Sequence, residues 1–261
     1  MKSRINKIQK TNLQAISKTL KLSMFALFLS LLSFTSNAQT ADEVINKFVT
    51  TTGGAEKWKA LKGIKMEMTT NQNGMEIPIE VVQLLGGNMY VKINLQGKEM
   101  TQMAYDGNTM WNMNFMTMKA EKMDAEATSN MKLNNQDFPE SLLDYKSKGY
   151  KAEYIGKETK EGAECHKIKF TKKPIMVAGV KTDDITFYYF ETENGLVIAS
   201  ETEVKEGPMK GQKSSSTMSD YQEVDGLFFP FSISQFGQPL KVKKITLNPV
   251  VDVKSFAFPA Q

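Results

Sequence analysis

The chain has 261 residues, of which 41% are hydrophobic and 10% aromatic, and its formal net charge is +4. Six of the 33 basic residues lie in the first 38 positions, which contain no acidic residue, so residues 39–261 carry a net charge of −2. Residues 39–261 therefore lack the excess of positive charge that is typical of nucleic-acid-binding proteins, and we expect no nucleic-acid partner. The remaining 223 residues suit one all-β domain.

Residues 1–38 have the pattern of a secretory signal peptide. A basic leader precedes an apolar run from Leu22 to Phe34, and Ser36 and Ala38 supply the small residues of a cleavage site. The run is shorter than the about 20 residues that cross a bilayer, although an uncleaved anchor is the alternative. No cysteine lies directly after the run, where a bacterial lipoprotein is acylated, so we expect a soluble periplasmic protein and not a lipoprotein, with its mature domain at residues 39–261.

The first elements of the mature domain are predicted to be helices. Thr40 and Glu43 have the spacing of a capping box, and the following apolar residues fall on one helical face until Gly53 and Gly54 end the helix. A shorter helix containing Trp58 is expected next.

From Ile64 onward the hydrophobic period changes to two, which indicates β-strands. Turn dipeptides such as Asn73-Gly74 and Asp106-Gly107 separate runs of alternating residues, as in a meander of hairpins. Residues 120–149 interrupt this pattern, and a helix with Pro139 in its first turn is predicted from Phe138 to Gly149. The alternation resumes afterwards to Leu247, so we predict a mainly β fold: a single open (half) β-barrel of about 10–11 antiparallel strands, with a few helices covering its concave face.

The sequence has few of the histidine and cysteine residues that enzymes use for catalysis. His166 is the only histidine, and Cys165 the only cysteine. No histidine-based metal cluster, nucleophile elbow or phosphate-binding loop is present, so we expect no enzymatic activity, no metal and no cofactor. His166 is interpreted as a core residue and Cys165 as an inert thiol. The alternatives for Cys165 are an intermolecular disulfide or a reactive thiol.

Methionine is unusually abundant in one stretch of the chain. Twelve of the 17 methionines lie between Met66 and Met131, most densely in residues 110–118. Because methionine is flexible and polarizable, such a surface can adapt to ligands of varying shape, and ordinary core packing is the alternative. The alternative of a Cu(I) site would use the thioethers of Met110, Met113, Met116 and Met118, with Met100 and Met103. Alternation along a strand places Met113 opposite Met110 and Met116.

Several segments together resemble periplasmic outer-membrane lipoprotein-sorting (LolA/LolB-like) proteins. The resemblance covers essentially the whole mature chain, as in a divergent member of that family. It rests on these stretches of sequence: ADEVINKFVTTTGGAEKWKALKGIK, AYDGNTMW, EYIGKETKEGAECHKIKF, YQEVDGLFFPFSI and KITLNPVVDVKSFAFP. The resemblance implies an open barrel capped by helices whose cavity shields acyl chains of a lipoprotein or another hydrophobic ligand, with membrane-associated sorting proteins as further partners.

The sequence therefore predicts a non-enzymatic periplasmic carrier, similar to the soluble carrier of that family. The alternative is a structural or protein-interaction domain whose cavity is filled, and the oligomeric state is left open. Strand parity and residue type select these candidates for the acyl cavity: Met66, Met68, Trp111, Met113, Phe115, Phe187, Phe229 and Phe231.

Overall fold

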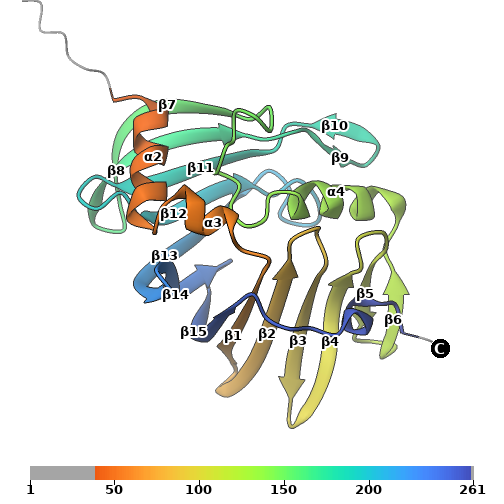
Figure 1. Ribbon diagram of the computed structural model, residues 1–261. Helices are drawn as coiled ribbons and strands as arrows, with labels where there is room; N and C mark the ends of the chain where they lie inside the picture. Colours follow the sequence, from red (N-terminus) through yellow and green to blue (C-terminus); the bar gives the residue numbers. More distant parts are fainter. Residues whose placement is uncertain (1–38, 260–261) are drawn as a thin grey trace, which may run out of the picture. The chain divides into compact units, whose positions relative to one another are not determined.

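The computed structural model describes residues 39–259, so the predicted signal peptide lies outside the described residues. Thirteen strands form one antiparallel sheet in the order β6-β5-β4-β3-β2-β1-β15-β14-β13-β12-β11-β8-β7, and the sheet is not closed (Figure 1). The predicted fold class is confirmed, although the sheet has more strands than the 10–11 expected. Strands β9 and β10 form a separate hairpin.

Within residues 39–259, three α-helices and one 3-10 helix accompany the strands. The helices are α2 (Ala41–Thr51), α3 (Ala55–Lys59), α4 (Ala125–Asn135) and η1 (Val253–Phe256). The first eight strands are β1 (Gly63–Gln72), β2 (Met75–Leu84), β3 (Met89–Leu95), β4 (Lys98–Tyr105), β5 (Met110–Asn114), β6 (Lys119–Lys122), β7 (Lys151–Lys160) and β8 (Ala163–Thr171). The others are β9 (Ile175–Val177), β10 (Val180–Thr182), β11 (Ile185–Glu191), β12 (Val197–Glu203), β13 (Lys213–Val224), β14 (Leu227–Gln235) and β15 (Gln238–Leu247).

The sheet consists of two meanders joined at one pair of strands. Strands β1 to β6 pair consecutively in one half, and strands β7 to β15, with β9 and β10 looped out, form the other. The halves meet where β1 pairs with β15, with Met66 opposite Ile245. We call this pairing the seam.

Helix α2 begins at the predicted capping box. The Thr40 hydroxyl accepts a hydrogen bond from the Glu43 amide at 3.2 Å, and the Glu43 carboxylate accepts one from the Thr40 amide at 2.8 Å. The apolar face of the helix buries Ile45 and Phe48 against the sheet, because residues three and four apart lie on one side of a helix. One face of the sheet thus receives α2, and we call it the inner face.

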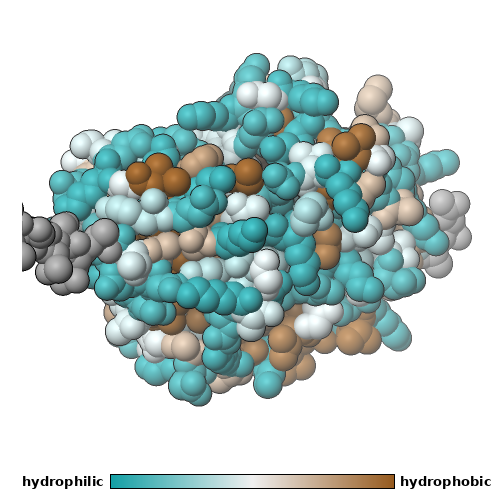
Figure 2. All heavy atoms as spheres, turned by 90° about the horizontal axis from the view of Figure 1, so that it is seen from above, coloured by the Kyte–Doolittle hydropathy of each residue, from teal (hydrophilic) through white to brown (hydrophobic). Residues whose placement is uncertain are grey.

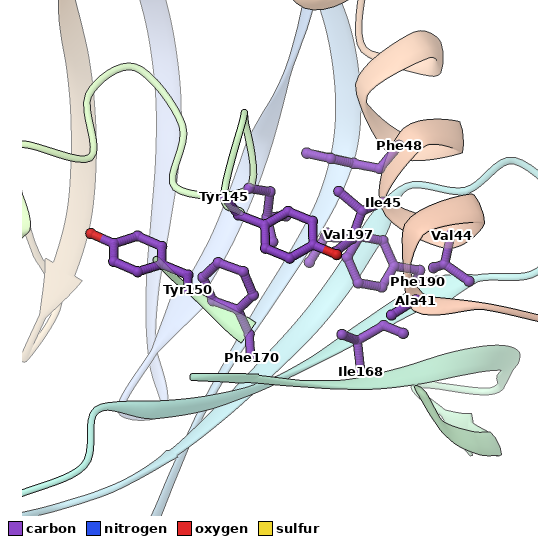
Figure 3. Packing of buried hydrophobic residues seen from close by; sticks show 11 residues of the cluster. Ala41, Val44, Ile45, Phe48, Tyr145, Tyr150, Ile168, Phe170, Phe190 and Val197 are labelled. Carbon is purple, nitrogen blue, oxygen red and sulfur yellow. The ribbon is translucent and has the colours of Figure 1, made fainter. Parts of the chain in front are cut away.

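Aromatic side chains fill much of the space between α2 and strands β8 and β11. Phe48 meets Phe190 edge-on at a centroid distance of 5.8 Å, and Tyr145 and Tyr150 each meet Phe170 at 5.8 Å. Figure 3 shows that the two tyrosines enter this core from the segment between α4 and β7, beside the residues of α2. Residues 136–150, which we call the cover segment, therefore pack on the inner face with the helix.

The helix predicted from Phe138 to Gly149 is wrong. That stretch forms a series of turns, in which Asp144 adopts the left-handed backbone conformation with φ of 50°. The helix lies earlier, in α4, where the Asp124 carboxylate caps the first turn by accepting from the Ala127 amide at 2.7 Å. Helix α4 carries no continuous apolar stripe, which is why the sequence pattern did not reveal it.

The exposed surface is dominated by hydrophilic side chains, with separate hydrophobic patches, on the face that Figure 2 shows. Large apolar side chains that stand out among the described residues include Met116, which is 96% exposed, and Val250. Within residues 39–259, none of the helices has the length and apolar character required to cross a bilayer.

Candidate functional site

A cavity of about 450 Å³ lies on the inner face, and apolar side chains dominate its walls. Strand β1 contributes Ile64 and Met66, β13 contributes Met218, and β14 contributes Phe229 and Ile233. Pockets that bind small molecules are mostly apolar and of this size. A recess of about 600 Å³ between α2 and residues 142–147 is larger, but charged Asp42, Asp144 and Lys146 line it.

The alternation of residues along the strands puts these side chains into the cavity. Met66 faces Val81 on β2 and Ile245 on β15, and Met218 faces Ile233. Side chains opposite one another in an antiparallel pair point to the same face of the sheet. A row of apolar residues therefore runs across the seam into both halves.

Two helical side chains close the cavity on another side. Phe48 from α2 and Trp58 from α3 both line it, and the Trp58 ring meets Phe229 edge-on at 5.1 Å. The Trp58 indole nitrogen donates to the hydroxyl of Thr52 at 3.1 Å, and this hydroxyl donates to the Phe48 carbonyl at 2.9 Å. Thr52 and Trp58 are buried, so this short chain of hydrogen bonds sets the position of the tryptophan.

The cover segment closes the cavity opposite the strands and is attached to them through a buried carboxylate. Asp137 accepts a hydrogen bond from the Tyr150 hydroxyl at 2.7 Å and pairs with Lys172 at 3.3 Å. Lys172 also pairs with Asp184 at 3.1 Å, and Lys148 lies 3.8 Å from Asp137. Each charge in this cluster therefore has an opposite partner, as buried charges require.

Among the described residues that line the cavity, Glu140 in the cover segment is the only one with a carboxylate. Its Oε1 accepts hydrogen bonds from the Ser141 hydroxyl and the Leu142 amide, both at 3.1 Å. Burial raises the pKa of this carboxyl. Burial and the nearby charge of Glu140 also raise the pKa of the Tyr188 and Tyr221 phenols, which line the same cavity.

The structure brings together at the cavity four of the eight residues that the sequence predicted to line it. Met66 and Phe229 line the cavity, and Met68 and Phe231 pack in the apolar cluster around it. All four come from strands β1 and β14, where one face is consistently apolar.

The other four residues lie elsewhere. Trp111 and Met113 point to the outer face, where Trp111 is buried against Phe256 and donates to its carbonyl at 3.1 Å. The chain after β15 runs across β2 to β4 there (Figure 1), and so covers an apolar surface that residue type alone had assigned to the cavity. Phe187 also packs on the outer face, with Tyr189, and Phe115 lies beyond the end of β5 and is 46% exposed.

Sequence reasoning missed Phe48, Trp58, Glu140, Tyr188 and Tyr221 as cavity residues. The helical pattern did place Phe48 and Trp58 on buried faces, which was a usable signal. Tyr188 follows Phe187 in a strand with aromatic residues at both parities, so alternation could not select the inward one. Glu140 had no signal, because its position depends on the turns of the cover segment.

The single histidine and the single cysteine lie outside the cavity lining. Nδ1 of His166 is 3.2 Å from the Tyr154 hydroxyl, and burial lowers the pKa of the imidazole. Cys165 is fully buried with Tyr189 and Ala199, and burial raises the pKa of its thiol. A low-pKa, accessible thiol is needed for reactivity, so this environment is that of a structural cysteine.

The methionine-rich stretch does not gather around one point. Met113 lies on the opposite face of β5 from Met110, and Met116 is almost fully exposed in the following turn. A Cu(I) site needs its thioethers on one side. The described residues also hold no group of three or more histidine, cysteine or acidic side chains arranged for a metal ion.

Comparison with known proteins supports the fold. No protein-family model matches the chain, and no curated protein matches it. A DUF1329 family protein from Desulfovibrio piger has 13% identity and a TM-score of 0.51, with 83% of this chain and 97% of that chain covered. A LolA superfamily protein from Nitrosomonas europaea has 14% identity and a TM-score of 0.50, with 84% and 98% covered. The chain therefore has a LolA-like open-barrel fold.

Proposed function

We propose that this protein is a periplasmic carrier that holds an acyl chain of a lipoprotein or of another amphiphile in the inner-face cavity, without catalysing a reaction. The observation that carries this proposal is the cavity itself, which is apolar, about 450 Å³ in volume and bounded by separate elements. The LolA-like fold supports the same function.

The energetics of burial suit a carrier. Transfer of a 16-carbon acyl chain from water to an apolar site is worth on the order of 12 kcal/mol, at about 0.8 kcal/mol per CH₂. Contacts between the acyl chain and the cavity must provide most of this free energy, and the carrier must still be able to release the chain. Residues of α2, α3 and the cover segment bound the cavity opposite the sheet, so in this proposal release of the chain requires at least one of these elements to move away from the strands.

The absence of a catalytic pair in the cavity supports binding over hydrolysis. Ser200 and Ser216 line the cavity, but no histidine is among the residues that line it. His166 lies beside Tyr154 instead. A serine nucleophile needs an adjacent base, and none of the described lining residues supplies an imidazole.

The cavity can be tested by filling it. Ser216 on β13 lines the cavity, whereas Ser219 on the same strand is exposed. We expect Ser216→Phe to weaken binding of the neutral fluorescent probe N-phenyl-1-naphthylamine by about ten-fold or more, and Ser219→Phe to leave it unchanged.

The bound ligand can be sought directly. Native mass spectrometry of protein isolated from its own periplasm should show a bound amphiphile. If wild-type protein carries none and does not bind the probe, the carrier function is wrong, and a protein-interaction domain whose cavity is filled is the better explanation.

A further inference from the structure

At a pH above its raised pKa, Glu140 gives the cavity a negative charge, and no basic side chain is among the described residues that line the cavity. From the part of the chain that the structure describes, the cavity lining includes one carboxylate and no lysine, arginine or histidine. The other polar groups there are neutral hydroxyls and amides, such as those of Tyr188, Tyr221, Ser200 and Gln83. A negatively charged ligand placed in this cavity would face Glu140 in surroundings of low polarity, where repulsion is strong.

The charge of Lys148 lowers the pKa of Glu140, but burial has the larger effect and raises it. Within its own segment, Lys148 donates to the backbone carbonyl of Glu140 at 3.2 Å and lies near Asp137, with which it forms an ion pair at 3.8 Å. From the strands packed against it, β11 presents Tyr188 and β13 presents Tyr221. Both phenols stay protonated because burial raises their pKa values.

The carboxylate keeps one oxygen for a ligand. Both side-chain hydrogen bonds that Glu140 receives from described residues go to Oε1, from Ser141 and Leu142. These two bonds shape the turn, and a glutamine oxygen could accept them equally well. The turn therefore requires neither the negative charge nor the Oε2 atom of Glu140. This indicates a second role for the side chain.

We propose that Glu140 selects the polar end of the bound amphiphile: the cavity takes a ligand whose head donates hydrogen bonds and carries no negative charge. The inference rests on the proposed carrier function and specifies its ligand class. A hydroxyl or ammonium group beside the acyl chain donates to Oε2, whereas the carboxylate of a free fatty acid does not.

The test compares probes with the same chain and different heads. Monolauroylglycerol, dodecylamine and laurate, each below its micelle-forming concentration, displace N-phenyl-1-naphthylamine from wild-type protein at about pH 8. We expect laurate to bind at least about ten-fold more weakly than the other two, because like charges repel in a desolvated site. This wild-type comparison needs no variant to fold.

Two variants locate the effect. We expect Glu140→Gln to bring laurate to within about two-fold of monolauroylglycerol. Asp144→Asn is the matched control, because Asp144 lies in the same segment with its carboxylate 55% exposed and paired with Lys59, and it should keep the discrimination. Equal wild-type binding of the three probes, or discrimination that persists in Glu140→Gln, would overturn the inference and leave the carrier function standing. Absence of all probe binding would instead contradict the carrier function itself.

Discussion

At the scale of single residues, a few buried polar side chains determine where the apolar walls of the cavity lie. Thr52 links the end of α2 to Trp58 of α3 through two hydrogen bonds, and Asp137 ties the cover segment to β8. Apolar contacts are not directional, whereas a hydrogen bond to a buried atom specifies one position. Trp58 and the cover segment are thus held in defined positions beside the apolar side chains that line the rest of the cavity.

Removal of the Thr52 hydroxyl should destabilise the protein. In Thr52→Val the indole nitrogen of Trp58 loses its buried acceptor, so we expect the free energy of unfolding to fall by about 1–3 kcal/mol. Thr52→Ser keeps the hydroxyl and should lose much less. Urea unfolding followed by tryptophan fluorescence measures both, and equal losses would show that the hydroxyl of Thr52 contributes no more to stability than its methyl group.

Glu140 should make stability depend on pH. Its pKa is raised in the folded protein, so the folded state binds more protons than the unfolded state between the two pKa values. Stability therefore falls as pH rises through that range. Glu140→Gln removes the ionisation, and we expect it to raise the free energy of unfolding by on the order of 1 kcal/mol at about pH 8 and by less at about pH 4. A difference that does not change between these pH values in thermal unfolding would contradict this reasoning.

At the scale of elements, polar contacts attach segments that have little apolar surface. The Glu126 carboxylate of α4 accepts from the amides of Ala178 and Gly179, both at 2.8 Å, in the turn of the β9–β10 hairpin. The Asn130 amide both donates to and accepts from the backbone of Met176. Helix α4 therefore docks on the hairpin mainly through such bonds, as its lack of an apolar stripe requires.

The anchoring of the cover segment can be tested with two aspartates from the same segment. Asp137 is 8% exposed and pairs with Lys172, so Asp137→Ala should lower the free energy of unfolding by about 3 kcal/mol or more, because it leaves a buried charge without this partner. Asp144 pairs with Lys59 at the surface, so Asp144→Ala should cost only about 1–2 kcal/mol, which is the cost of placing alanine in the left-handed backbone conformation of this position. Chemical denaturation of both variants measures the difference. A small loss in Asp137→Ala would mean that Asp184 alone suffices for Lys172.

The sequence predicted where helices and strands lie better than it predicted which face of the sheet a side chain occupies. The capping box and the apolar stripe located α2, and the period-two runs with their turn dipeptides located most strands. The cover segment could not be predicted, because its turns depend on contacts with distant residues such as Phe170 and Lys172. Strands β5 and β11 carry large apolar side chains on both faces, so Trp111 and Phe187 were assigned to the cavity although they pack on the outer face.

At the scale of the whole sheet, the seam between β1 and β15 unites two halves that otherwise pair within themselves. The two free edges are protected in different ways. Strand β6 is short and carries exposed Lys119, Glu121 and Lys122, and β7 is rich in charge and interrupted by an irregularity near Gly156. Short, charged or irregular edges resist pairing with other chains.

Weakening the seam should destabilise both halves together. Ile245 is 7% exposed and pairs with Met66, so Ile245→Ala should cost about 2–5 kcal/mol. Val250→Ala, at a fully exposed position just beyond β15, is the control and should leave stability unchanged. We expect tryptophan fluorescence and circular dichroism to report one coincident, shifted transition. Two separated transitions would show that the halves unfold independently.

The seam also has a consequence for the chain while it is being synthesised. Strands β1 to β6 leave the ribosome long before β15, so the nascent meander has β1 as an edge without its native neighbour. That edge carries Ile64, Met66 and Met68 and lacks the short length and dense charge that protect β6 and β7. Association between incomplete chains should therefore begin at β1, and a separate peptide of the β15 sequence should suppress it by occupying that edge.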